Sequence, residues 1–171
     1  MYRKESEEIM VYVLADNIIS PLGDTSEDNY QAVKAGKSAI RAYAPMTDGI
    51  PDGFIASLMS ADFEYLVFRS AGKAIEASGI NVADARSVFI LSSTKGVIEG
   101  LGKDADENLY LGETAQRIAT RLGFTTRPVV VCNACISGSA AMILASRLLQ
   151  LGTYDHVVVC GADCPQRFII S

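Results

Sequence analysis

Three short apolar runs, separated by helical patterns, constrain the fold of this chain most strongly. The runs are "SVFIL" at 87–91, "PVVVC" at 128–132 and "HVVVC" at 156–160. Strands that are apolar without alternation are buried on both faces, which is typical of parallel sheets covered by helices. The helical patterns between them predict an α/β domain with a mostly parallel sheet. In such sheets, functional sites lie at the carboxyl ends of the strands.

The rest of the chain also divides into predicted elements. The apolar stretch "IMVYVL" at 9–14 predicts a further strand, and residues 44–60, with two prolines and two glycines, predict a loop. Thr25 and Ser26 are candidate N-caps for the first helix. Helices are predicted at about 25–35, 61–78, 109–121 and 138–151.

Length and composition exclude several classes of protein. The chain has 171 residues, of which 49% are hydrophobic and 20% charged, so residues 1–171 are expected to form a single folded domain. A formal net charge of −5 argues against a nucleic-acid-binding protein, which needs a basic face. No stretch reaches the eighteen or so apolar residues of a membrane span, and the N-terminus does not read as a secretory signal.

Four cysteines without a signal peptide indicate a reducing compartment, so we expect a cytoplasmic protein with free thiols. Cys132-x2-Cys135 and Cys160-x3-Cys164 have spacings near those of zinc ligands. Two of these cysteines end apolar strands, however, whereas zinc knuckles lie in polar, glycine-rich turns. We therefore expect no metal site. A thiol redox pair at Cys132 and Cys135, or merely buried thiols, remain alternatives.

A nucleophilic role for Cys135 fits the local pattern better. The residue lies between an apolar strand and a helix that opens with "ISGSAA", and small residues let a substrate approach the backbone. A helix N-terminus carries partial positive charge, which favours a thiolate and can stabilise an oxyanion. The arrangement is similar to the nucleophile elbow of hydrolases. Cys132 is then expected to be the last buried residue of the strand.

The helix after Cys135 is apolar over an arc of roughly 200°, wider than one sheet can cover. Ser139, Ser146 and Gln150 share one narrow polar strip on the rest of the helix, and Ile143 and Arg147 interrupt what remains. We therefore expect a second covering layer, supplied by a partner chain or by sequence beyond this chain.

The segment "CNACISGSAAMILASRLLQLGTYDHVVVCGAD" resembles the active-site region of β-ketoacyl-(acyl carrier protein) synthases, in the thiolase-like superfamily. The matching features are Ala134-Cys135, Ser137-Gly138 and Gly161-Ala162-Asp163. The opening strand leading into "IISPLG", the helix "EDNYQAVKAGKSAIR" and the loop "STKGVIEGL" are similar to family segments in the same order. Residues 44–60 and 98–112 look shorter than is usual there.

The resemblance implies the N-terminal half of a thiolase-like layered fold and an acyltransferase of fatty-acid or polyketide-type synthesis. Cys135 would take an acyl group from the phosphopantetheine thioester of an acyl carrier protein, with no further cofactor. A malonyl-type extender would then lose CO2 and attack the acyl-cysteine. Thr94, Lys95 and Gly96, in the glycine-containing loop, would contact the substrate, although solvated loop lysines are the norm.

The family's decarboxylating residues, two histidines or a histidine and an asparagine, lie in the C-terminal half of a longer chain. Here His156, the one histidine, begins a strand and is expected to be structural. The resemblance therefore implies an incomplete synthase that is inactive alone. It would work with a complementary C-terminal half or as a homodimer paired through residues 128–134. The alternative is a non-catalytic partner or fragment of a split synthase.

Overall fold

The computed structural model describes residues 9–45, 53–59, 61–98 and 110–165, and every structural statement below concerns these residues. The elements follow one another in this order: α1 (Ser26–Lys34), β1 (Arg41–Tyr43), β2 (Phe54–Ala56), α2 (Phe63–Ser78), β3 (Ser87–Ser92), α3 (Leu111–Leu122), β4 (Val129–Val131), the 3-10 helix η2 (Ala134–Ile136), α4 (Ser137–Gln150) and β5 (His156–Gly161).

The three predicted apolar runs form one parallel sheet in the order β4-β3-β5, which confirms the predicted α/β class. The central strand β3 is buried along its whole length. Its register places Leu91 beside Val130 on one side and beside Cys160 on the other. Because all three strands are parallel, their carboxyl ends meet at the same edge of the sheet.

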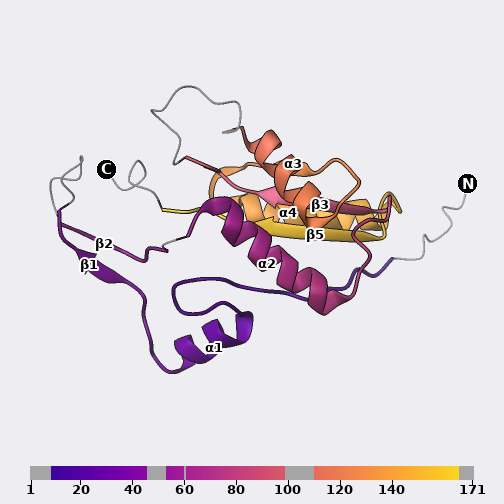
Figure 1. Ribbon diagram of the computed structural model, residues 1–171. Coiled ribbons are helices and arrows are strands. Elements are labelled where there is room, and N and C mark those ends of the chain that lie inside the picture. The colour runs from indigo at the N-terminus through magenta and orange to yellow at the C-terminus, as the bar shows by residue number, and fades with distance from the viewer. Residues whose placement is uncertain (1–8, 46–52, 60, 99–109, 166–171) are drawn as a thin grey trace, which may run out of the picture.

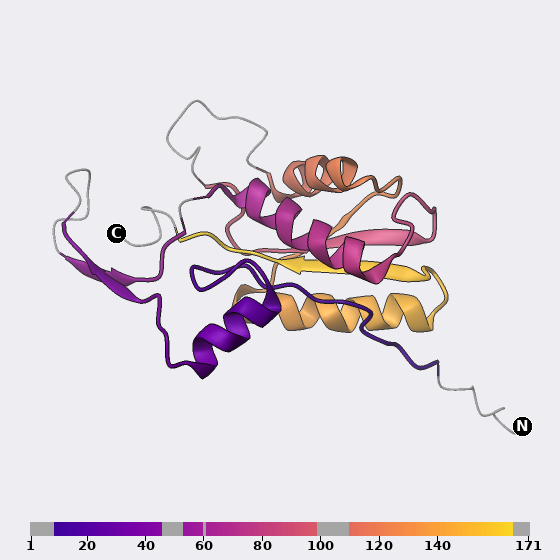
Figure 2. The same cartoon turned by 60° about the horizontal axis from the view of Figure 1, so that its bottom comes forward.

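Helices cover both faces of this sheet, with α2 and α3 on one face and α4 on the other (Figure 2). Successive side chains of a strand point to opposite faces. Phe89 and Leu91 accordingly pack into the core under α2 and α3, whereas Ile90 packs against Ala141 and Ala145 of α4. The sheet therefore carries two separate apolar cores.

Capping contacts define the helix ends, and the one at the start of α1 comes from the predicted N-cap Thr25. The Thr25 side chain accepts a hydrogen bond from the Asp28 N–H at the start of α1, and Asp62 does the same for Tyr65 at the start of α2. Gly79 ends α2 in the left-handed conformation, with φ 67°. These contacts satisfy backbone groups that a helix leaves unpaired at its termini.

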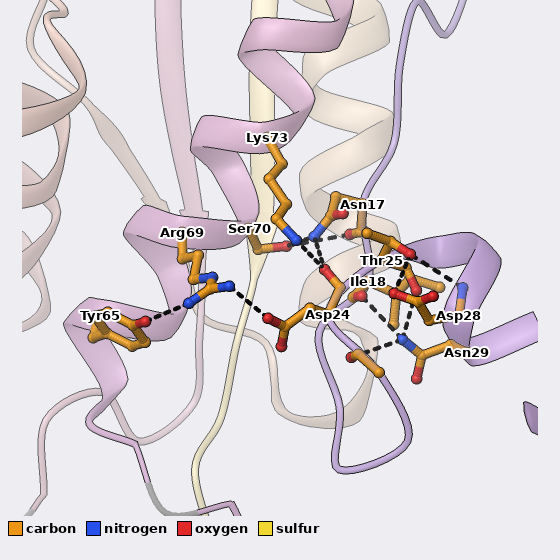
Figure 3. A network of polar contacts seen from close by, with 11 residues as sticks. Asn17, Ile18, Asp24, Thr25, Asp28, Asn29, Tyr65, Arg69, Ser70 and Lys73 are labelled. Carbon is orange, nitrogen blue, oxygen red and sulfur yellow. Dashed lines mark hydrogen bonds and ion pairs between the residues drawn. The ribbon is translucent and has the colours of Figure 1, made fainter.

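A polar network ties the segment before α1 to α2 (Figure 3). The Arg69 guanidinium contacts the Asp24 carboxylate at 2.6 Å, and Lys73 Nζ donates to the Asp24 carbonyl at 2.9 Å. Asn29, which is buried, donates to three backbone carbonyls, those of Ile18, Gly23 and Thr25. The turn before α1 is therefore held from both of its sides.

Two predictions about strands were wrong. Residues 9–14 form no strand, because they lie beside β5 without pairing to it, and their side chains are exposed, from 38% for Val11 to 79% for Val13. Conversely, part of the predicted loop at 44–60 pairs as β2 with β1 in an antiparallel arrangement (Figure 1). The Tyr43 and Phe54 rings of this pair stack with their centroids 5.2 Å apart. Residues 46–52 and 60 of that loop lie outside the described residues.

The outer surface of α4 has no cover in the described chain. Ile136, just before α4, and Met142 and Ile143 within it are exposed by 54%, 60% and 53%. Of the apolar arc predicted on this helix, Met142 is left exposed, whereas Ala141 and Ala145 are buried against the sheet, and a second covering layer stays a prediction. Among the helices of the described residues, none is long and apolar enough to cross a membrane.

Candidate functional site

Cys135 lies on a tight elbow between β4 and α4. The chain leaves the sheet after Val131 and turns through the single 3-10 turn η2 directly into α4. Ala134, the residue before Cys135, has φ 46°, and no other non-glycine residue among those described has a positive φ. Such strain in a residue with a side chain concentrates at functional sites. The elbow therefore presents Cys135 in an exposed, strained position, which is consistent with a nucleophile.

The Ser137 hydroxyl fixes this elbow. It accepts a hydrogen bond from the Asn133 N–H at 2.8 Å and donates to the Ala134 carbonyl at 2.7 Å. The Ile136 N–H donates to the Asn133 carbonyl at 3.1 Å. The Asn133 side chain makes no capping bond, and the Asn133 backbone N–H and carbonyl tie down the turn.

An open cavity of about 280 Å³ lies in front of Cys135, where the carboxyl ends of β3 and β5 meet the start of α4. Its lining residues are Ser92, Ala134, Cys135, Ser137, Gly138, Gly161, Ala162 and Asp163. The elbow and the strand ends thus enclose a space for a substrate at the edge where parallel sheets carry their sites.

A second, larger cavity of about 570 Å³ runs along β5, between α2, α4 and the segment 11–17. Gly138 and Gly161 line both cavities.

The loop after β3 is hydrogen-bonded to Asp163, the second residue after the end of β5. The Asp163 carboxylate accepts hydrogen bonds from the Ser93 and Thr94 hydroxyls at 2.9 and 3.1 Å. It also accepts bonds from the N–H groups of Thr94 and Lys95 at 3.1 and 3.2 Å. This contact joins the strand ends beside the cysteine.

Of the predicted substrate-contacting residues, Thr94 and Lys95 lie on this loop, with Thr94 half-buried and Lys95 exposed. Gly96 is buried with φ 63°, and a Cβ there would lie 2.7 Å from Leu111 Cδ2. None of the three is among the residues that line the 280 Å³ cavity. Their contact with a substrate stays a prediction.

The four cysteines fall into two environments. Cys132 is exposed rather than buried, because β4 is an edge strand that ends at Val131. Cys160 and Cys164 are buried in the core under α2 and α3. Burial raises the pKa of the Cys160 thiol to about 12. Within the described part of the chain, no three His, Cys, Asp or Glu residues are grouped so that they could hold a metal ion.

His156 lies at the opposite end of β5 from Cys135. Its N–H donates to the Arg86 carbonyl at 3.2 Å, beside an ion pair in which Arg86 Nε contacts the Asp155 carboxylate at 2.6 Å. This ion pair lowers the pKa of Asp155 and raises the pKa of Arg86. The surroundings of His156 are therefore those of a residue that aligns the starts of β3 and β5.

The sequence alone assigned no role to Ser137 or Asp163. They entered only as residues that match the pattern of β-ketoacyl synthases. A signal was available for Asp163, because a carboxylate directly after one parallel strand lies close to the polar loop that follows the next. For Ser137 the signal was a hydroxyl at the first position of a helix, where such residues satisfy backbone groups.

The sheet, its two helical layers and a cysteine on a strand-to-helix elbow define the class of protein: an α/β fold with the arrangement of a nucleophile elbow. No protein-family model matches the chain, and no curated protein matches it. Among solved structures, the chain is similar to a β-ketoacyl synthase from Burkholderia phymatum STM815, with a TM-score of 0.61 and 19% sequence identity. The match covers 83% of this chain and 44% of that one, so the chain spans less than half the length of that synthase. The chain therefore has a fold found in part of a β-ketoacyl synthase.

Proposed function

We propose that this chain is the acyl-accepting part of a β-ketoacyl synthase, with Cys135 as its nucleophile. The observation that carries the proposal is the position of Cys135, exposed at a strained elbow and facing a cavity built from two strand ends. The fold shared with a solved β-ketoacyl synthase supports the same reaction class.

In the proposed step, Cys135 Sγ attacks the carbonyl carbon of an acyl thioester carried on the phosphopantetheine of an acyl carrier protein. A bond forms between that carbon and Sγ, and the bond to the pantetheine sulfur breaks. The pantetheine thiol leaves with the proton that Cys135 gives up. The partial positive charge at the N-terminus of α4 stabilises the oxyanion that forms in between.

Condensation with a malonyl-type extender needs further groups that stabilise the carbanion left after loss of CO2. The chain has one histidine, and it lies at the far end of β5 from the Cys135 cavity. We therefore propose that the chain completes this second half-reaction only with a complementary partner. Decarboxylation of a malonyl thioester by the isolated chain would contradict this part of the proposal.

Two surfaces support a partner of this kind. The exposed apolar side chains of Ile136, just before α4, and of Met142 and Ile143 in α4 suit a complementary domain that supplies the second layer. β4 is an edge strand of the sheet, so a second copy could pair with it through residues 128–134. The first arrangement gives a two-part synthase and the second a homodimer.

The test is acyl transfer from a short acyl-pantetheine thioester to the purified chain, followed by intact-mass measurement and peptide mapping. We expect one acyl group, located on Cys135. Cys135→Ser should abolish the mass increase, and Cys132→Ser should retain it. Acylation of Cys132, or none under conditions where the chain is folded, would overturn the proposal.

A thiol redox function is the second candidate, because Cys132 and Cys135 are both exposed. Mild oxidation would then convert the pair to a reversible disulfide and lower the mass by two protons. A pair that stays reduced while acyl transfer to Cys135 proceeds would exclude this alternative.

A further inference from the structure

Within the described part of the chain, Asp163 accepts four hydrogen bonds, all from one loop. They come from Ser93, Thr94 and Lys95, at donor–acceptor distances of 2.9 to 3.2 Å. Three of the four end on the same oxygen, Oδ1. A carboxylate that accepts several bonds from adjacent residues holds their backbone in a single shape.

The backbone of this loop is shaped to receive an anion. The successive N–H groups of Thr94 and Lys95 converge on one oxygen, which is the geometry of an anion-binding nest. The Gly96 N–H closes the turn by donating to Ser93 Oγ at 3.0 Å, and its φ of 63° suits glycine. The chain thus fills its own nest with the Asp163 carboxylate.

Asp163 also lines the cavity in front of Cys135, together with Ser92 and Gly161. The Ala162 N–H donates to the Ser92 carbonyl at 3.0 Å, so the two strand ends are joined just before Asp163 reaches the loop. A single side chain therefore forms part of the cavity wall and fixes the loop behind that wall.

We propose that Asp163 is a positioning residue for Cys135. Its hydrogen bonds hold the 93–96 loop and the end of β5 in the arrangement that determines which thioester chains reach the thiol. The role rests on the proposed function, since it takes Cys135 as the reacting residue. It depends on the acceptor oxygens of Asp163, which accept only from backbone N–H and hydroxyl groups among the residues that the structure describes.

Three variants separate positioning from charge and from simple destabilisation. Asp163→Ala removes all four acceptor contacts. Asp163→Asn keeps an oxygen that can accept from Ser93, Thr94 and Lys95 but removes the charge. Asp155→Asn is the matched control, because it weakens a carboxylate contact at the other end of β5, far from Cys135.

The first readout is amide hydrogen exchange in the loop. For Asp163→Ala we expect the Thr94 and Lys95 amides to exchange at least about fivefold faster, as the loss of ordinary hydrogen bonds implies. The second readout is the labelling rate of Cys135 relative to Cys132, with iodoacetamide and with a maleimide that carries an aliphatic chain. The preference of Cys135 for the small reagent should fall in Asp163→Ala and persist in Asp163→Asn and Asp155→Asn.

The proposal is overturned if Asp163→Ala speeds amide exchange yet leaves the reagent preference of Cys135 unchanged, since Asp163 would then be only a structural tie. It is also overturned if Asp163→Asn behaves like Asp163→Ala, or if Asp155→Asn shifts the preference equally. Labelling of the buried Cys160 and Cys164 would reveal an unfolded variant. In that case Thr94→Val, which removes one hydroxyl contact with Asp163, replaces Asp163→Ala in both measurements, and the same outcomes support or overturn the proposal.

Neither readout requires acyl transfer. If Cys135 is acylated but its reagent preference is unchanged in Asp163→Ala, only the positioning role of Asp163 is refuted. If the preference changes but Cys135 is not acylated, only the proposed acyl transfer is refuted.

Discussion

The Ser137 hydroxyl and the Asn133 N–H, joined at 2.8 Å, close the elbow that carries Cys135. The first residue of α4 thereby binds the last residue before η2. Because Ser137 also donates to the Ala134 carbonyl, one side chain satisfies backbone groups on both sides of the strained residue. This explains how a residue with φ 46° persists without a glycine.

Ser137→Ala should loosen this elbow. Ser137 is only 5% exposed, and the substitution removes its two hydrogen bonds, to the Asn133 N–H and the Ala134 carbonyl, so it should cost about 1–3 kcal/mol of unfolding free energy. Urea denaturation measures the loss. Ser139→Ala, at an exposed position of the same helix, is the control and should stay within about 0.5 kcal/mol of the wild type. Equal effects of the two substitutions would contradict the role of Ser137.

Asn29→Ala should detach the turn before α1. The buried Asn29 amide donates to three carbonyls, and removing it leaves them without this partner, so a loss of about 1–3 kcal/mol is expected. Gln31→Ala, at an exposed site of the same helix, should have little effect. The account of this turn fails if Asn29→Ala is as stable as Gln31→Ala.

Two glycine-to-alanine substitutions should act in opposite directions. Gly96→Ala places a side chain at φ 63° and near Leu111, so it should destabilise the fold by about 1–2 kcal/mol. Gly72→Ala, inside α2 with no atom within 4 Å of the new Cβ, should stabilise it by about 0.5–1 kcal/mol. Thermal unfolding of both variants checks the signs, and a stabilising Gly96→Ala would show that the loop is not held as described.

Stability should fall at alkaline pH because of Cys160. Burial raises its pKa from 9.0 to about 12, so below pH 9 the thiol keeps its proton in both the folded and the unfolded state. Between pH 9 and about 12 only the unfolded state loses that proton. The free energy of unfolding therefore falls by at most about 1.4 kcal/mol per pH unit.

Denaturation of Cys160→Ala over the same pH range isolates this contribution. The variant should have a shallower decline than the wild type, because it lacks the thiol whose pKa burial raises. Identical slopes for Cys160→Ala and the wild type would show that the Cys160 thiol does not remain protonated in the fold.

Sequence periodicity was enough to predict the strands β3, β4 and β5 and the helices around them. The spacing of apolar residues in each segment reflects which of its faces is buried. The unbroken apolar run "SVFIL" predicted a buried strand, and Thr25 marked the start of a helix by local chemistry. Such signals depend on each segment's own residues and need no knowledge of the rest of the fold.

What could not be predicted depends on partners distant in sequence. The run "IMVYVL" has the composition of a strand, but a strand forms only where another pairs with it. The exposure of Cys132 follows from the place of β4 at the sheet edge, and the Asp163 contact joins residues about seventy positions apart. Neither strand order nor such a contact can be read from one segment alone.

Competition among the four thiols for limiting iodoacetamide tests the central claim most directly. Peptide mapping of the folded chain should place most of the label on Cys135, less on Cys132, and essentially none on the buried Cys160 and Cys164. Cys135→Ser should remove that dominant product without increasing labelling of the two buried thiols. Preferential labelling of Cys132 in the wild type would contradict the assignment of Cys135 as the nucleophile.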